Sequence, residues 1–235
     1  MAQLVANEER LLGLFARGSI VKIDGLREPE HAAVAAAAGA DLIGFIFAPA
    51  RRQVTAAVAR SCIAAARENA LGRNVLSVGV FVDATPSEMA HIAQEAGIDA
   101  VQLHGAEPPD TMRQLPVPAL KALRPKPGTS AIDVLTEASR YRSTSTPALG
   151  ILVDGYVEGV AGGTGARADW QLASEVAASC PILLAGGLNP QNVGAAIRQV
   201  RPLGVDVSSG VEIDGVKAAD RIEEFIHAAR KAFQG

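Results

Sequence analysis

The sequence contains few cysteines, few aromatic side chains and little net charge, and each shortage excludes a class of protein. Its 235 residues include two cysteines, Cys62 and Cys180, which are far apart and not flanked by histidine-rich segments. Neither a disulfide framework nor a zinc ligand set is therefore expected, and both cysteines are predicted to be buried small residues in a reducing cytoplasm. We expect no metal and no cofactor.

A net charge of −3 with mixed signs argues against a nucleic-acid partner, because binding to phosphates requires a basic face. The most apolar stretch, residues 32–50, contains Asp41 and many alanines, so it favours a helix followed by a strand over a membrane span. The start of the chain lacks the basic and apolar segments of a signal peptide. We expect neither a nucleic acid nor a membrane as partner.

Apolar residues make up 49% of the chain and aromatics only 4%, which predicts a core of Ala, Val, Ile and Leu. Leu4, Leu11, Leu12 and Phe15 are spaced as on a short amphipathic helix. We therefore expect residues 1–19 to form a helical N-terminal extension and residues 20–235 a single catalytic domain, a size that one barrel can reach.

Eight short aliphatic runs recur along the chain with helix-like segments between them. Capping signals precede several of those segments, at Thr85-Pro86-Ser87-Glu88, at Asn189-Pro190 and at Asp169. This alternation predicts parallel βαβ units and, with eight repeats, a (β/α)8 TIM barrel. A doubly wound sheet has the same alternation, but no G-x-G-x-x-G follows the first run. The predicted strands are Ile20–Ile23, Leu42–Phe47, Val75–Phe81, Ala100–Leu103, Ala119–Leu123, Gly150–Val153, Ile182–Ala185 and Val205–Val207.

In a TIM barrel the chemistry belongs at the carboxyl ends of the strands. Glycine- or serine-rich turns follow the last three predicted strands, and small residues let backbone N–H groups approach an anion. One such turn is explained by a tight connection alone, whereas two adjacent ones, at Gly186-Gly187 and at Ser208-Ser209, favour a phosphate site.

Asp24 and Asp154 end the first and sixth predicted strands, across the barrel mouth from each other. Two carboxyl groups separated by a substrate can act as general base and general acid, although aspartates at strand ends also serve as caps. The guanidinium of Arg52 could clamp a carboxylate, and Arg51 is expected to lie on the surface. His104 could orient a substrate or be purely structural.

Lys22 and Lys121 lie within predicted strands, where a lysine can be a Schiff-base nucleophile but more often pairs with a carboxylate. If Asp24 is held in an ion pair with either lysine, its role as a free base is weakened.

These motifs, in this order from about residue 20 to residue 230, resemble the phosphoribosylanthranilate isomerase family of tryptophan (aromatic amino acid) biosynthesis. The resemblance implies an Amadori rearrangement of N-(5-phosphoribosyl)anthranilate to 1-(2-carboxyphenylamino)-1-deoxyribulose 5-phosphate. It also implies that Asp154 is the general acid, that Arg52 holds the anthranilate carboxylate and that the phosphate binds at Gly163, Gly165, Gly186, Gly187, Ser208 and Ser209. The matching motifs are VKI-x-GL from residue 21, GFIF from 44, VFV from 80, VQLHG from 101, ILVD from 151, GGTG from 162, AGGLNP from 185 and GVDVSSGVE from 204.

The resemblance departs at position 24, where the family has a general-base cysteine and this chain has Asp24. An ionised thiol is the stronger base, while an aspartate is ionised at pH 7 but weakly basic unless burial raises its pKa. An Asp/Asp pair instead resembles the phosphoribosylformimino carboxamide ribotide isomerase of histidine biosynthesis. That family grips two phosphates, and the turn at residues 48–52 lacks the glycine pair this would need.

Three functions follow from these observations. The leading hypothesis is a phosphoribosylanthranilate isomerase-like enzyme with Asp24 as base and Asp154 as acid. The alternatives are a paralogue isomerising another phosphorylated aldose or aminoaldose, and a catalytically silent phosphate-ligand binder. The expected partner is a small phosphorylated sugar, and the chain is expected to be a monomer or a homodimer.

Overall fold

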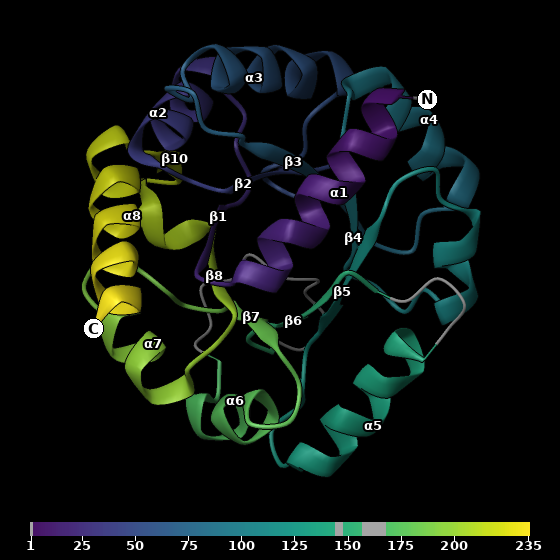
Figure 1. Ribbon diagram of the computed structural model, residues 1–235, viewed down its shortest axis with the longest axis vertical. Helices are drawn as coiled ribbons and strands as arrows, with labels where there is room; N and C mark the ends of the chain where they lie inside the picture. The colour runs from purple at the N-terminus through teal and green to yellow at the C-terminus, as the bar shows by residue number, and fades with distance from the viewer. Residues whose placement is uncertain (1, 144–147, 157–167) are drawn as a thin grey trace.

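The computed structural model describes residues 2–143, 148–156 and 168–235, and side chains from residue 7 onward. Eight parallel strands close into a barrel in sequence order, with β1 pairing β8 from Ile20↔Gly204 to Ile23↔Val207. Figure 1 shows the strands at the centre and helices around them. The predicted (β/α)8 barrel is confirmed. The strands are β1 (Ile20–Ile23), β2 (Leu42–Ile46), β3 (Leu76–Phe81), β4 (Ala100–Leu103), β5 (Ala119–Leu123), β6 (Gly150–Val153), β7 (Ile182–Leu184) and β8 (Gly204–Val207).

Eight α-helices and two 3₁₀ helices occur within the described residues. After β4 the connection holds a 3₁₀ helix instead of the predicted α-helical segment, because Pro108 and Pro109 leave only a short run that can coil. The helices are α1 (Ala2–Arg17), α2 (Pro29–Ala38), α3 (Ala56–Glu68), α4 (Pro86–Ala96), η1 (Pro109–Gln114), α5 (Ala131–Arg142), α6 (Trp170–Ala177), α7 (Val193–Val200), η2 (Ser209–Val211) and α8 (Ala219–Gln234).

Two of the three predicted helix starts are confirmed. Thr85 and Glu88 form a reciprocal capping box on α4, and the Asp169 carboxylate accepts from two N–H groups at the start of α6. At Asn189 the predicted cap is present, although helix α7 itself begins at Val193. The Asn189 side chain accepts from the N–H groups of residues 191 and 192, and its carbonyl oxygen accepts from the N–H of Val193, so the capped turn leads into α7.

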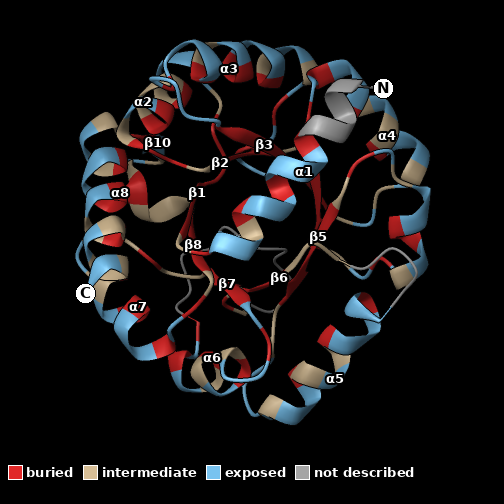
Figure 2. Ribbon diagram, in the orientation of Figure 1, coloured by how far each residue is buried: buried red, intermediate tan, exposed pale blue. Residues whose placement is uncertain are grey.

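The core has two parts. Between the barrel and its helices, residues such as Phe45, Phe81 and Phe225 are fully buried, and Figure 2 shows the strands almost entirely in the buried colour. Inside the barrel, toward the amino ends of the strands, an aliphatic layer includes Ile20 and Leu42. Cys62 and Cys180 are free and buried, as predicted.

Helix α1 covers the amino end of the barrel, where it crosses the strands in Figure 1. Leu11 and Leu14 are buried in the aliphatic layer inside the barrel, and the Asn7 side chain donates to Asp99 at 2.6 Å. Leu12, predicted to share the apolar face, is 55% exposed, because the helix turns it away from the layer that Leu11 joins.

A short antiparallel hairpin follows β8 at the opposite end of the barrel. It consists of β9 (Glu212–Ile213) and β10 (Val216–Lys217), joined by a turn through Asp214 and Gly215 at positive φ. The hairpin lies between the carboxyl end of β8 and helix α8, so it borders the predicted site. No helix in the described part of the chain is long and apolar enough to cross a membrane.

Candidate active site

The predicted strand-end residues gather at the carboxyl rim of the barrel. The N–H of Asp24 donates to the carbonyl oxygen of Val207 at 2.8 Å, and the N–H of Asp154 donates to that of Leu123 at 3.0 Å. Each aspartate therefore continues the strand ladder by one residue. These two hydrogen bonds fix the backbone position of each aspartate, and therefore the point from which its side chain extends.

Asp24 is buried, and a glycine on the neighbouring strand makes its position possible. A Cβ on Gly44 of β2 would lie 1.7 Å from Asp24 Oδ1, so any larger residue would displace the carboxylate. The carboxylate is not free, because Lys22 Nζ lies 3.2 Å from Asp24 Oδ1. This is the ion pair that weakens the prediction of a free base.

Lys22 divides its charge between two carboxylates. Lys22 and Asp206 are partners in the β1–β8 ladder, so their side chains leave the sheet on the same face, and Lys22 Nζ lies 3.2 Å from both Asp206 oxygens. Asp24, two residues after Lys22, shares that face. The predicted pairing of Lys22 with a carboxylate is confirmed, and Asp206 is a site residue that sequence reasoning missed.

The charges in this cluster perturb one another. Burial raises the pKa of Asp206 well above its ordinary value; Lys22 opposes the rise, while Asp24 and Asp154 add to it. Burial lowers the pKa of Lys22, but Asp206 and Asp24 more than offset this and raise it. The Lys22 ammonium thus lies between a carboxylate at the end of its own strand and one on the neighbouring strand β8.

His104 lies beside Asp154, with His104 Nε2 3.4 Å from Asp154 Oδ2. The Gln102 side-chain nitrogen, fully buried on β4, is 2.9 Å from His104 Nδ1. When the Gln102 amide donates to Nδ1, the imidazole proton resides on Nε2. Nε2 is buried and makes no hydrogen bond among the described residues, so His104, predicted to contact a substrate, lies beside Asp154 without being bonded to it.

Arg52 is buried and already holds a carboxylate from the hairpin. Its Nε lies 2.5 Å from Glu212 Oε1 and its Nη2 lies 2.9 Å from Glu212 Oε2, a fork geometry. Arg51 and Lys217 also contact Glu212, at 2.7 and 3.2 Å. Although burial alone would raise the pKa of Glu212, hydrogen bonds from Arg52 and Arg51 and the charge of Lys217 lower it to about 2.

The two proposed phosphate turns are in contact with each other. Gly186 and Gly187 have φ of +86° and +64°, a region that glycine occupies without strain. A Cβ on Gly210, at the turn after β8, would lie 1.8 Å from the carbonyl oxygen of Leu188, so the turns pack backbone to backbone. Ser208 and Ser209 are thereby brought beside the glycine pair, and the predicted Gly163 and Gly165 lie outside the described residues.

Gly25 lies where Arg52 and Ser208 approach the backbone after β1. Its φ is +70°, and a Cβ there would lie 2.7 Å from Arg52 Cδ and 2.9 Å from Ser208 Oγ. The guanidinium stem and the serine hydroxyl therefore approach the backbone directly after Asp24. Gly25, the residue after Asp24, thus lies between the Arg52 side chain and the Ser208 hydroxyl.

Comparison with known proteins decides the family. Residues 21–228 match the family described as N-(5'phosphoribosyl)anthranilate (PRA) isomerase. The N-(5'-phosphoribosyl)anthranilate isomerase of Roseiflexus castenholzii is 44% identical over 216 residues, 91% of this chain and 99% of that protein. The chain belongs to the N-(5'-phosphoribosyl)anthranilate isomerase family.

Solved structures of phosphoribosyl anthranilate isomerases have the same fold. The crystal structure from Thermotoga maritima has a TM-score of 0.75 and 34% identity, covering 90% of this chain and 98% of that one. A second, in complex with reduced 1-(o-carboxyphenylamino)-1-deoxyribulose 5-phosphate, has a TM-score of 0.71 at the same identity and coverage. This family likeness extends over the whole barrel.

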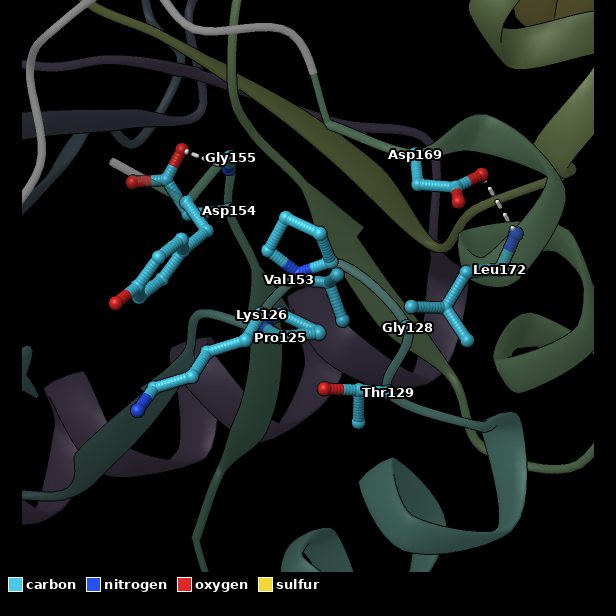
Figure 3. Close-up of a pocket in the computed structure, with 11 residues that line it drawn as sticks. Pro125, Lys126, Gly128, Thr129, Val153, Asp154, Gly155, Asp169 and Leu172 are labelled. Atoms are coloured by element: carbon cyan, nitrogen blue, oxygen red, sulfur yellow. Dashed lines mark hydrogen bonds between the residues drawn. The ribbon is translucent and has the colours of Figure 1, made fainter. Parts of the chain in front are cut away.

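In this member of the N-(5'-phosphoribosyl)anthranilate isomerase family, a pocket of about 190 Å³ opens beside Asp154 (Figure 3). The loops after β5 and β6 form it, and Lys126 Nζ lies 6.0 Å from the centre of the Tyr156 ring. The lining residues are Pro125, Lys126, Pro127, Gly128, Thr129, Val153, Asp154, Gly155, Tyr156, Asp169 and Leu172.

Lys121, the other predicted strand lysine, is paired with a carboxylate in this family member as well. Its Nζ lies 2.8 Å from Glu107 Oε2 and both side chains are buried. Glu107 also accepts from the N–H groups of Asp83 and Gly105, so the pair ties the ends of β3, β4 and β5 together. Within the described residues no group of three His, Cys, Asp or Glu side chains could hold a metal ion.

Proposed function

We propose that this chain isomerises N-(5-phosphoribosyl)anthranilate to 1-(2-carboxyphenylamino)-1-deoxyribulose 5-phosphate, a step of tryptophan biosynthesis. The observation that carries the proposal is the family match over residues 21–228. In addition, two strands each end in a carboxylate, near the turns at Gly186-Gly187 and Ser208-Ser209. The reaction moves protons and changes no overall oxidation state. General acid and general base groups are the chemistry it needs.

Asp154 is proposed as the acid that protonates the ring oxygen of the sugar, so that the ring opens and a Schiff base forms at carbon one. The His104 imidazole lies beside this carboxyl group, with its Nε2 3.4 Å from Asp154 Oδ2. Asp154 also borders the pocket of Figure 3, which gives a leaving oxygen access to its carboxyl group.

Asp24 is proposed as the base that removes the proton from carbon two, in the place where the resemblance puts a cysteine. The enamine left behind then becomes the ketose by proton transfer. Lys22 Nζ lies 3.2 Å from the Asp24 carboxylate and 3.2 Å from that of Asp206. The lysine charge is therefore shared, and Asp24 is only partly neutralised by it. Oxygen Oδ1 is buried, and its contact with Lys22 is an ion pair without hydrogen-bond geometry.

The remaining proposed contacts hold the two charged ends of the substrate. Arg52 is assigned to the anthranilate carboxylate, and the phosphate is assigned to Gly186, Gly187, Ser208 and Ser209 together with Gly163 and Gly165 outside the described residues. Because Glu212 already occupies one edge of Arg52, the substrate carboxylate binds a guanidinium whose orientation is fixed in advance.

The test is turnover of N-(5-phosphoribosyl)anthranilate by the purified protein, with product followed by chromatography. Asp154→Asn and Asp24→Asn are expected to lower kcat at least about a hundredfold, as loss of a general acid or base does. Glu223→Gln, an exposed change on α8, is the matched control. The proposal fails if the unsubstituted protein shows no turnover and Asp24→Cys alone gains it, because the scaffold would then be right and the activity of this chain wrong.

The setting of the enzyme is also a proposal. We expect a cytoplasmic protein, supported by two free buried cysteines, which suit a reducing compartment. We expect a monomer or a homodimer, and light scattering of the purified chain distinguishes these.

A further inference from the structure

Lys217 is a buried cation that contacts the turn after β8, and neither the sequence motifs nor the family match gives it a role. Only 6% of the residue is exposed. Its Nζ donates to the Ser208 carbonyl oxygen at 2.7 Å and lies 3.4 Å from Ser208 Oγ and 3.2 Å from Glu212 Oε1. The end of the hairpin is thus anchored to the turn.

This anchor sets the direction of a peptide group. A peptide unit is planar and trans, so the carbonyl of one residue and the N–H of the next point to opposite sides. Because Lys217 holds the Ser208 carbonyl, the N–H of Ser209 is turned away from the lysine. An N–H fixed in one direction is a better anion donor than one that must reorient.

The charge on Lys217 also acts on a turn whose own residues are neutral. Glu212 is the carboxylate partner of Lys217, but it is shared with Arg51 and Arg52, so three cations surround one carboxylate. Glu212 therefore offsets only part of the charge of Lys217. A buried positive charge next to a turn of N–H groups favours an oxyanion there.

We propose that Lys217 is a further residue of the phosphate subsite, which positions the Ser208–Ser209 peptide and supplies the positive charge for an oxyanion. Through Glu212, the same lysine is tied to Arg52, so one hairpin sets both the phosphate end and the carboxylate end of the site. The proposal rests on the proposed function for the assignment of this turn to phosphate.

The experiment measures sulfate binding by calorimetry, because sulfate keeps one charge state between pH 6 and about pH 9.5 and requires no turnover. Lys217→Met is expected to weaken sulfate binding about tenfold, the effect of losing one charge-assisted contact. Lys217→Arg is expected to retain binding within about threefold. Lys231→Met, the same change at an exposed position on α8, is the control and leaves binding unchanged.

A pH series separates this role from a purely structural one. Burial lowers the pKa of Lys217 to about 8; Glu212 opposes the shift, Arg52 adds to it and Asp24 opposes it. Sulfate binding by the unsubstituted protein is therefore expected to weaken as the pH rises through about 8, and binding by Lys217→Arg to stay constant.

Steady-state kinetics adds a second measurement. Phosphate contacts are the same in the ground state and the transition state, so Lys217→Met is expected to raise KM about tenfold and change kcat less than about threefold. Equal sulfate binding by the unsubstituted protein and Lys217→Met overturns the proposal, as does pH-dependent binding by Lys217→Arg. If Lys217→Met does not fold, the arginine variant alone decides. Sulfate binding that depends on Lys217 without any turnover would refute the proposed function and leave this inference standing.

Discussion

Replacing Glu212 by Gln tests whether the ion cluster of the hairpin stabilises the fold through charge. Glutamine keeps the shape of the side chain and removes its charge, leaving Arg51, Arg52 and Lys217 without their carboxylate. The pKa of Glu212 is lowered from 4.5 to about 2. At about 1.4 kcal/mol per pKa unit, this corresponds to about 3 kcal/mol of stability at pH 7.

The pH dependence of this loss has a fixed sign. A carboxyl group whose pKa is depressed by folding stabilises the folded state above its unfolded pKa, and the contribution disappears as the pH falls through the folded value. For Glu212 that window runs from about 4.5 down to about 2. The stability difference between the unsubstituted protein and Glu212→Gln is thus expected to fall from about 3 kcal/mol at pH 7 to about 1 kcal/mol at pH 3.

Urea unfolding followed by circular dichroism at both pH values measures this difference. Glu223→Gln on α8, an exposed carboxylate, serves as the control and is expected to change the free energy of unfolding by less than about 0.5 kcal/mol. A loss that is the same at pH 7 and pH 3 would refute the reasoning, because the stabilisation would then come from packing and not from the charge of Glu212.

Three further outcomes are expected. Gln102→Leu should lower kcat about tenfold with little change in KM, because the imidazole beside the proposed acid loses the partner that fixes its proton. Gly44→Ala should lower kcat by at least about tenfold, since the new Cβ would displace the Asp24 carboxylate. Its control is Gly13→Ala, at an exposed position of helix α1, which should raise the free energy of unfolding by about 1 kcal/mol. Steady-state kinetics and urea unfolding of both variants test this. Lys22→Met should cost about 3–5 kcal/mol in urea unfolding, because it leaves buried carboxylates unpaired.

The barrel could be predicted because its strands are buried on both faces and read as continuous aliphatic runs. Four of the eight predicted runs have the bounds of the observed strands, and each of the others differs at one end by one residue. At Asn189 the sequence located the cap but not the first α-helical residue. The Asn189 side chain accepts from two N–H groups in the turn that leads into α7, and the helix begins at Val193.

The charge pairs of the site could be predicted only where they are local. Lys22 and Asp24 are two residues apart on one strand, so alternation alone places them on the same face. By contrast, His104 reaches Asp154 across an intervening strand, and Glu212 reaches Arg52 from the far end of the chain. No periodicity in a single sequence encodes contacts of that separation.

Helix α1 packs against the end of the barrel opposite the candidate active site, and this separation has an evolutionary consequence. The segment 1–19, which we propose to be an extension of the barrel, covers the amino end with Leu11 and Leu14, while the proposed reacting groups lie on the opposite rim. Packing and chemistry thus draw on separate sets of residues. A chain arranged in this way can vary the residues at its carboxyl rim, while the layer that keeps the barrel closed stays as it was.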